Sequence, residues 1–350
     1  MSAGSKTPAE LLSGYDGPPL RIMEVCGTHT HEIFRLGIRR LLPPQVELIS
    51  GPGCPVCVTP VGFIDEAVWL ALEQGVTIAT FGDLVRVPGT ELSLAGARAQ
   101  GGKVQVVYSP LDAVDYARQH RETQVSFLSV GFETTTPASC LAVEQAQRLG
   151  LGNFSLLTAN KTMPNAYQAL KGSADVFLYP GHVHAITGTG LCEDLAGQGV
   201  SGVVTGFTAG ELVSALAVAV TKSREGRPFF YNAYPRVVTR AGNPAAVKLM
   251  DRLMEPCDSE WRGLGTIPGS GLRLGPDYAA YDARLKFHMP KITGRANPAC
   301  RCGEVLQGKC KPSDCPVFGK VCTPQHPVGA CMVSGEGACS AYYQYGGDLT

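Results

Sequence analysis

Short apolar runs alternate with amphipathic segments along most of residues 20–222. The runs have the length of buried strands, and the amphipathic segments have the spacing of helices that bury one face. Strands alternating with helices in this way predict βαβ units and a mostly parallel sheet. The expected strands are 20–25, 46–49, 76–81, 104–108, 125–130, 154–157, 176–179 and 203–204, and the expected helices are 31–42, 64–74, 92–100, 111–119, 138–149, 164–171, 191–197 and 209–222.

A polar stretch at residues 118–123 precedes a fresh strand and marks the preferred domain boundary. We therefore predict an α/β protein with two similar open, mostly parallel α/β domains and a small irregular C-terminal domain. The predicted divisions are a flexible leader at 1–18, α/β domains at 19–122 and 123–225, a connecting region at 226–290 that packs on both, and a cysteine-rich cluster-binding domain at 291–350.

The connecting region is less periodic than the segments before it. We expect a strand at 229–238 and a helix at 243–253, which Pro256 would end. The glycine-rich stretch at 261–274 predicts a loop or a loosely regular segment. From residue 297 onward cysteine, proline and glycine dominate, and a segment of that kind folds around a covalent or metal staple.

The overall composition is that of a globular protein, with 44% hydrophobic and 17% charged residues. The 30 basic and 30 acidic residues give a formal net charge of zero, and no long charge run appears, which argues against nucleic-acid or membrane-surface partners. No stretch approaches the length of an apolar membrane span, and the first twenty residues lack a hydrophobic signal core. We therefore expect a cytoplasmic protein.

Thirteen cysteines need an explanation in such a protein, because cysteine-dense segments in a reducing compartment favour metal or redox chemistry over structural disulfides. The spacing of the C-terminal cysteines matches neither a zinc ribbon nor the compact bacterial ferredoxin run. An iron–sulfur cluster held by four cysteines is the favoured reading, with zinc next and a disulfide framework third. The C-terminal cysteines are Cys300, Cys302, Cys310, Cys315, Cys322, Cys331 and Cys339.

The loop after the first expected strand combines a thiol with two imidazoles, in Cys26, His29 and His31. Loops at the C-terminal ends of parallel strands are where α/β sheets hold ligands. Cys26 is therefore a candidate metal ligand. His29 is either a second ligand or a structural residue, and His31 more plausibly begins the helix that follows.

The loop after the second expected strand carries Cys54 and Cys57 as a Cys-x-x-Cys pair. The pair resembles a redox-active dithiol, in which a helix N-terminus lowers one thiol pKa, although half of a metal site or a pair of inert loop cysteines are alternatives. If the first two strands are neighbours, the three thiols and His29 converge at one edge of the sheet.

Two later strand ends carry further candidates, Glu133 and His182. Glu133 is a candidate general base or hydrogen-bond acceptor, and the threonines beside it are candidate helix caps or ligand contacts. His182 is either part of the site or a histidine of an ordinary turn.

Several motifs together resemble the HypD-type [NiFe]-hydrogenase maturation proteins over residues 20–345. They are CGTHT at 26–30, GPGCPVC at 51–57, GFETT at 131–135, PGHV at 180–183 and CMVSGEGAC at 331–339, supported by GN at 242–243 and WRGLGTIP at 261–268. The resemblance implies two α/β domains of similar fold and a [4Fe-4S] cluster in the C-terminal segment. It also implies an assembly scaffold that holds iron with a HypC-type chaperone and receives cyanide from a HypE-type partner. The completed Fe(CN)2CO unit would then pass to the hydrogenase large subunit.

Carried over by position, the resemblance assigns a role to each thiol site. It implies that Cys26 holds the iron with His29 beside it, and that Cys54 and Cys57 relay electrons between the cluster and the iron. The implied cluster ligands are Cys302, Cys315, Cys322 and Cys331, with Cys339 as the alternate and Cys300 and Cys310 as extras.

The chain departs from the family pattern at two places. His184 stands where the family usually has serine, and residues 208–211 replace a Glu-Pro-x-Asp run, with Glu211 one position from the usual acid. Both departures concern the second α/β half and its part in docking or cyanide handling. Two other functions stay open, a stand-alone iron–sulfur thiol/disulfide oxidoreductase and a zinc-stabilised binding module.

Overall fold

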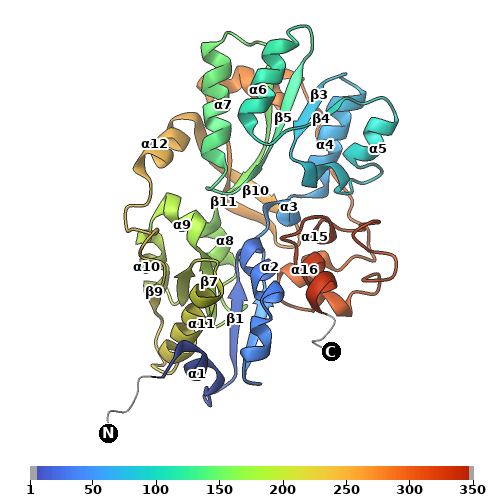
Figure 1. The fold of residues 1–350 in the computed structure, drawn as a ribbon. Helices are drawn as coiled ribbons and strands as arrows, with labels where there is room; N and C mark the ends of the chain where they lie inside the picture. The colour runs from blue at the N-terminus through green and yellow to red at the C-terminus, as the bar shows by residue number, and fades with distance from the viewer. Residues whose placement is uncertain (1–5, 347–350) are drawn as a thin grey trace.

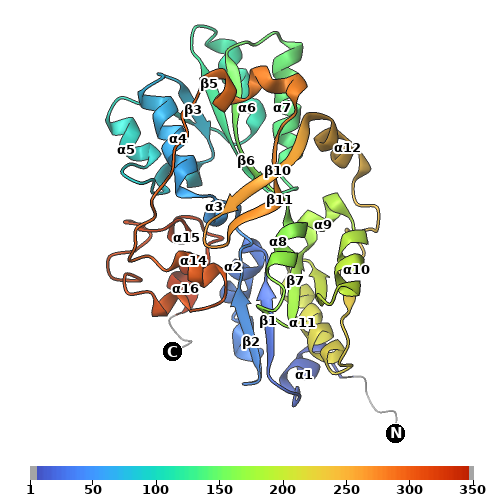
Figure 2. The ribbon, with the colours of Figure 1, turned by 180° about the vertical axis from the view of Figure 1, so that it is seen from behind.

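The computed structural model describes residues 6–346, and Figures 1 and 2 show two α/β regions stacked one above the other. The strands are β1 (Leu20–Glu24), β2 (Val46–Ser50), β3 (Thr77–Thr80), β4 (Val104–Val106), β5 (Val125–Gly131), β6 (Phe154–Lys161), β7 (Val176–Pro180), β8 (Gly202–Thr205), β9 (Phe230–Asn232), β10 (Met254–Trp261) and β11 (Gly265–Leu274). The helices are α1 (Pro8–Ser13), α2 (Gly27–Arg35), α3 (Pro55–Val58), α4 (Val61–Leu72), α5 (Leu94–Ala99), α6 (Pro110–Gln119), α7 (Thr136–Arg148), α8 (Met163–Ala169), α9 (Gly181–Thr187), α10 (Gly190–Gly197), α11 (Ala209–Ser223), α12 (Pro244–Leu253), α13 (Ala283–Lys286), α14 (Cys302–Leu306), α15 (Ala330–Val333) and α16 (Ala338–Tyr345). Each of the eight expected strands is present.

The first sheet, called sheet A, has the strand order β2-β1-β7-β8-β9, and all of its pairings are parallel. On one face of the sheet, apolar side chains of α1, α2 and α11 pack against the strand side chains that point toward these helices. The other face packs into a second cluster that also holds cysteines of the C-terminal segment. Parallel strands buried on both faces explain why these runs are continuously apolar.

The second sheet, called sheet B, has the order β10-β11-β6-β5-β3-β4. Its β6, β5, β3 and β4 are parallel, and the β10–β11 hairpin is added antiparallel beside β6. Helices α6, α7 and α12 pack on one face, and α4, α5 and α15 pack on the other. The fold class, with two mostly parallel α/β sheets and a cysteine-rich C-terminal region, is confirmed.

The two sheets are not built from consecutive halves of the chain. Sheet A joins β1 and β2 to β7, β8 and β9, whereas β3 to β6 lie between these groups in sequence and belong to sheet B. The expected boundary near residue 122 therefore does not separate the sheets. Local periodicity identifies strands, but pairing between distant strands is decided by which faces bury each other.

The connecting region at 226–290 contributes strands to both sheets. The predicted helix at 243–253 is confirmed as α12, whose first turn is capped by the Asn243 side chain accepting from Ala246 N at 3.1 Å. The predicted loop at 261–274 is wrong, because most of it forms β11 between β10 and β6. Pro256 lies within β10 and does not itself stop the helix, and proline is tolerated there because β10 is an edge strand.

Part of the predicted leader is folded. Residues 8–13 form α1, which begins with a capping box between Thr7 and Glu10 and packs against α11. Leu12 and Tyr15 are buried beneath it. The remainder of the predicted leader includes residues 1–5, which lie outside the described residues.

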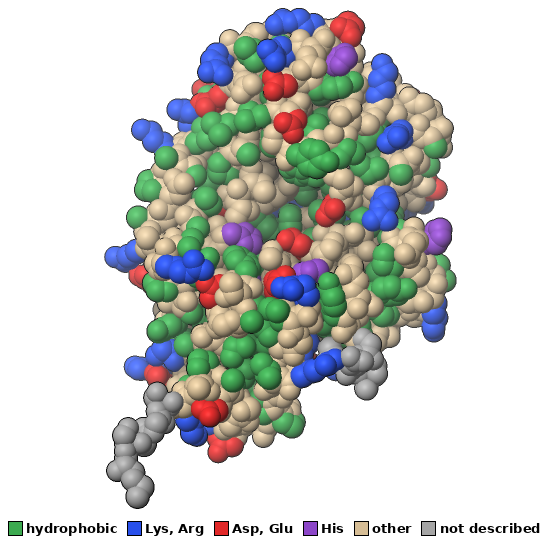
Figure 3. Space-filling view, in the orientation of Figure 1, with side chains coloured by type: hydrophobic (Ala, Val, Ile, Leu, Met, Phe, Trp, Pro, Cys, Tyr) green, Lys and Arg blue, Asp and Glu red, His purple; other side chains and the backbone are tan. Residues whose placement is uncertain are grey.

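Two further observations concern membrane-spanning helices and the distribution of charge. Within residues 6–346 no helix has the length and apolar character needed to cross a membrane. On the face drawn in Figure 3, basic and acidic side chains are scattered among apolar and neutral ones, and neither sign gathers into a large patch.

Each parallel sheet has one point where the chain changes its direction of winding. In sheet A this point lies between β1 and β7, and in sheet B it lies between β5 and β3. Ligands of open α/β sheets bind outside the carboxyl ends of the strands at such points. The Cys26 and His182 loops follow β1 and β7, and the Glu133 loop follows β5.

Candidate functional site: a thiol-lined metallocentre

The Cys26 loop and the Cys54 loop pack directly against each other because β1 and β2 are neighbours in sheet A. Gly27 N donates to Gly53 O at 3.0 Å. A β-carbon built on Gly53 would lie 2.0 Å from Cys26 N, and one built on Gly27 would lie 3.1 Å from the β-carbon of Cys54. The expected convergence of these two loops at one sheet edge is therefore present.

Cys26 occupies the position just before helix α2, which begins at Gly27 and not near residue 31 as the sequence predicted. Burial raises the pKa of the Cys26 thiol to about 12, and the backbone N–H groups of His29 and Thr28 oppose this rise. Such a thiol stays protonated at neutral pH unless a metal ion binds the sulfur and displaces the proton. Cys26 is thus inert by itself and suited to a metal ion.

Glu336 reaches this loop from the C-terminal segment, and sequence reasoning assigned it no role. Its Oε1 accepts from Thr28 Oγ1 at 2.7 Å. His31 also meets this segment, since its Nδ1 lies 3.0 Å from Gly335 O. The motif at 331–339 contained the only signal for Glu336, because nothing local indicated a contact with a loop so distant in sequence.

His29 is buried on the first turns of α2 and presents one nitrogen without a partner. Its Nε2 lies 3.0 Å from Gly206 O, and because a carbonyl only accepts, Nε2 carries the hydrogen. Its Nδ1 is buried and has no hydrogen-bond partner within residues 6–346. Burial lowers the pKa of His29 to about 3, so the imidazole is neutral and offers a free lone pair.

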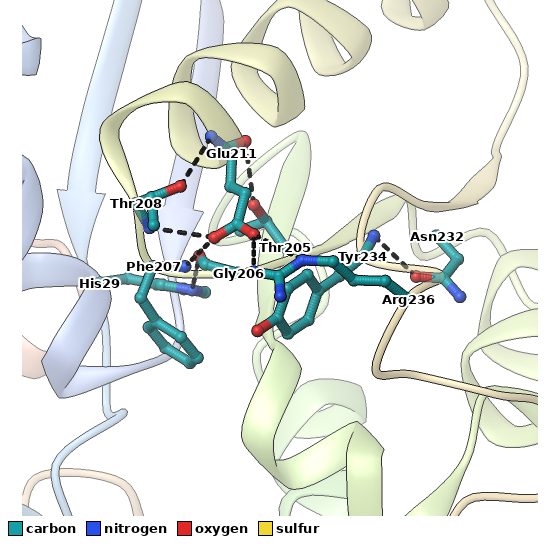
Figure 4. A network of polar contacts seen from close by, with 9 residues as sticks. All are labelled: His29, Thr205, Gly206, Phe207, Thr208, Glu211, Asn232, Tyr234 and Arg236. Atoms are coloured by element: carbon teal, nitrogen blue, oxygen red, sulfur yellow. Dashed lines mark hydrogen bonds and ion pairs between the residues drawn. The ribbon is translucent and has the colours of Figure 1, made fainter.

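The Gly206 carbonyl is held by the network drawn in Figure 4. Glu211 accepts from Phe207 N at 2.9 Å and from Thr208 N at 3.0 Å, and it forms an ion pair with Arg236. Hydrogen bonds from Arg236 and Thr208 lower the pKa of Glu211 to about 2 against the opposing effect of burial, which keeps it ionised. Glu211, one of the departures from the family pattern, therefore fixes the loop that orients His29.

His182 and His184 point into different surroundings although both lie on α9. The His182 ring stacks on Phe207 at 5.1 Å, and Phe207 in turn lies 4.9 Å from the His29 ring. His184 is buried, with Nδ1 3.0 Å from Gly188 O and Nε2 3.5 Å from the Tyr167 hydroxyl. His182 belongs to the His29 neighbourhood, whereas His184 packs the core.

Glu133 lies at the end of sheet B that faces sheet A. Its Oε1 accepts from Met163 N at 2.9 Å, and its buried Oε2 has no partner among the described residues. Burial raises the pKa of Glu133 to about 7.

Cys54 and Cys57 flank the single turn of α3, and both are buried. Cys57 N donates to Cys54 Sγ at 3.3 Å. The expected lowering of a thiol pKa is not found for Cys57, because burial raises its pKa, while a hydrogen bond with Cys331 opposes the rise. Cys57 therefore lies beside Cys54, and α3 packs against α15, which carries Cys331, within one buried cluster.

Six C-terminal cysteines line one small cavity. Cys302 and Cys331 are in contact there, with sulfur atoms 2.7 Å apart. Cys310 lies outside it, in a separate surface cavity beside Arg39 and Lys311. The six are Cys300, Cys302, Cys315, Cys322, Cys331 and Cys339, so the structure brings the predicted ligands and the alternate together and adds Cys300.

The donor set of this cavity, six thiols, includes the four thiolates that a four-iron cluster takes, one on each iron. Cys302 and Cys331 would have to move apart to bind different irons, because their sulfur atoms are in contact. Nη2 of Arg262, beside Cys300 and Cys302, is buried without a partner, as expected beside an anionic group.

Comparisons with known proteins identify the family of this chain. The family model described as "Hydrogenase formation hypA family" and named HypD matches residues 8–346. The chain is 44% identical over 338 residues to the hydrogenase maturation factor HypD of Azotobacter vinelandii, covering 93% of this chain and 89% of that one. It is also 44% identical over 333 residues to HypD of Escherichia coli strain K12, covering 93% and 89%. The chain therefore belongs to the HypD family of hydrogenase maturation factors.

Proposed function

We propose that this maturation factor is the scaffold and redox partner for assembly of the Fe(CN)2CO centre of [NiFe]-hydrogenases. It would hold the iron with a HypC-type chaperone and receive cyanide from a HypE-type partner, before the hydrogenase large subunit takes the product. One observation carries the proposal: Cys54, Cys57, Cys331 and Cys302 are buried in one cluster, with the Cys302 and Cys331 sulfur atoms in contact and the Cys54 loop packed on the Cys26 loop. We further propose that it acts in the cytoplasm without nucleic-acid or membrane partners.

Cys26 and His29 are the proposed contacts for the iron cargo. A thiolate is a soft ligand that suits low-spin iron, and His29 offers the free lone pair of Nδ1. Iron binding would displace the Cys26 proton, which burial otherwise retains. The Gly206 carbonyl fixes the hydrogen of His29 on Nε2, as second-shell acceptors do for metal-bound histidines.

Cys54 and Cys57 are the proposed redox pair. Oxidation of the dithiol forms one S–S bond and releases two protons and two electrons, which pass one at a time to an external one-electron acceptor. Two successive one-electron reductions by an external one-electron donor, with uptake of two protons, reverse it. The cavity residues Cys302, Cys315, Cys322 and Cys331, with Cys339 as the alternate, would hold a [4Fe-4S] cluster that supplies one-electron transfer. The packing of α3 against α15, which carries Cys331, brings the pair close to that cavity.

Glu133 and His182 are proposed to handle protons during cyanide transfer. Glu133 can hold or release a proton at neutral pH, because burial raises its pKa to about 7 and leaves Oε2 unpartnered. His182 is neutral, since burial lowers its pKa to about 4, and it can accept hydrogen bonds beside Phe207.

The test is the Cys26→Ala variant, purified without oxygen together with the chaperone. We expect native mass spectrometry to show loss of the single cargo iron, with the iron of the cluster retained. The CN and CO infrared bands should disappear, and the circular dichroism spectrum should stay unchanged. Cys140→Ala is the matched control, because Cys140 is a buried cysteine of α7 remote from this site. Normal CN and CO bands in Cys26→Ala would contradict the iron-ligand role.

The same preparation distinguishes the scaffold from the alternative function, a stand-alone iron–sulfur thiol/disulfide oxidoreductase. That function predicts disulfide reduction through Cys54 and Cys57 with no chaperone bound and no CN or CO bands in the natural protein. Co-purification with a small chaperone supports the scaffold.

A further inference from the structure

Arg262, in the WRGLGTIP motif, has no role in the assignments above, and its backbone is tied to the redox helix. Arg262 N donates to Val58 O at 2.8 Å, and its Nε donates to Thr59 O at 2.9 Å. Val58 directly follows Cys57. These two bonds hold both the backbone and the guanidinium of Arg262 against the end of α3.

The next residue ties the same segment to the cysteine cavity. Gly263 has a φ of +82°, and a β-carbon built on it would lie 2.4 Å from the Cα of Gly303, the residue after Cys302. The Gln307 side chain also donates to Gly263 O. Arg262 is therefore held between α3, which carries Cys57, and the first turn of α14, which carries Cys302.

The charge of Arg262 lacks the partner that its neighbours have. Arg295 and Arg301 line the same cavity, but they form ion pairs with Glu91 and Glu304. Arg262 Nη2 is buried and has no hydrogen-bond partner in the part of the chain that the structure describes. An arginine remains charged in proteins, and a buried unpaired charge is costly unless an anionic group lies beside it.

The groups that face Arg262 identify that anionic group. Arg262 lines a larger surface cavity together with Cys300 and Cys302, and these two cysteines also line the separate cysteine cavity, which Arg262 itself does not line. An iron–sulfur cluster with its thiolate ligands is negatively charged, and each reduction adds one more negative charge. A fixed cation beside two of the lining cysteines stabilises the reduced form more than the oxidised form.

We propose that Arg262 is a positioning residue that raises the reduction potential of the cluster and so sets electron transfer between the cluster and Cys54/Cys57. The inference rests on the proposed function, in which the cavity holds a [4Fe-4S] cluster. The rigid clamp between α3 and Gly303 would keep the charge in place in both redox states of the pair.

The experiment is an anaerobic redox titration of the full-length protein with dithionite, followed by electron paramagnetic resonance of the reduced cluster. In Arg262→Gln we expect the midpoint potential to move negative by ~59 mV, which is about a tenfold change in a one-electron equilibrium. Arg262→Lys retains a charge and should lie between this variant and the natural protein. Arg295→Gln is the matched control, because its charge is exposed and already paired, and it should leave the potential unchanged.

Each outcome decides the inference. A fully loaded Arg262→Gln protein with an unchanged midpoint overturns it, and so does an equal shift in Arg295→Gln. If Arg262→Gln folds but does not retain its cluster, Arg262→Lys decides, because loss of the cluster there as well shows that the charge is not what matters. A natural protein with normal circular dichroism and no cluster would instead overturn the proposed cofactor and this inference together.

Discussion

Replacing Gly53 with alanine should push apart the two loops that carry Cys26 and Cys54. The new β-carbon would lie 2.0 Å from Cys26 N, 2.2 Å from Cys26 Cα and 2.4 Å from the carbonyl carbon of Val25. All three are backbone atoms, so no side-chain rotation relieves the overlap. The β1 end and the Gly53 loop must move apart, and Cys26 moves with them.

The cost of that movement has two parts. Overpacking in a well-packed region costs about 1–3 kcal/mol. Separation also breaks the hydrogen bond from Gly27 N to Gly53 O, and such a bond contributes about 1 kcal/mol. The free energy of unfolding should therefore fall by roughly 2–4 kcal/mol.

Urea unfolding of the iron-free protein measures this change, and native mass spectrometry measures iron retention. Gly152→Ala is the control, because a β-carbon there would meet nothing within 4 Å and Gly152 does not have a positive φ. That variant should stay within ~0.5 kcal/mol of the natural protein. A Gly53→Ala protein with natural stability and normal iron content would refute the packing argument.

Two further predictions concern the protons and the cluster. Because burial raises the pKa of Glu133 from 4.5 to about 7 in the folded state, the folded protein holds that proton more tightly, so its stability is full below pH 4.5 and falls as pH rises toward 7. Between about pH 5 and about pH 8 the free energy of unfolding should fall on the order of 3 kcal/mol in the natural protein, and Glu133→Gln should remove this fall. Urea midpoints at the two pH values measure it. An identical pH dependence in both proteins would disprove the prediction. Cys302→Ser should lose the absorbance band near ~400 nm and the bound iron, whereas Cys310→Ser should keep both because Cys310 lies outside the cavity; equal loss in the two variants would contradict this ligand set.

Much of the local structure could be predicted from the sequence. Buried parallel strands are continuously apolar, so β1 to β8 were identifiable from their runs alone. The glycine-rich β11 was not, because glycine has a low strand propensity and its pairing with β10 and β6 depends on neighbours from distant parts of the chain. The helical start at Gly27 was also missed, since α2 begins with glycine and threonine, which favour helices weakly.

The sequence by itself determined the chemistry that this protein carries: the thiols, the imidazoles, the Cys-x-x-Cys pair and their places at strand ends. Only the tertiary structure decided which of these groups meet. Helix α3, with Cys57, packs against α15, with Cys331, and Thr28 donates to Glu336 across 308 positions of sequence. The physical reason is that side-chain type and periodicity are local properties, whereas such contacts depend on how two interleaved sheets bury their faces against each other and against the C-terminal segment.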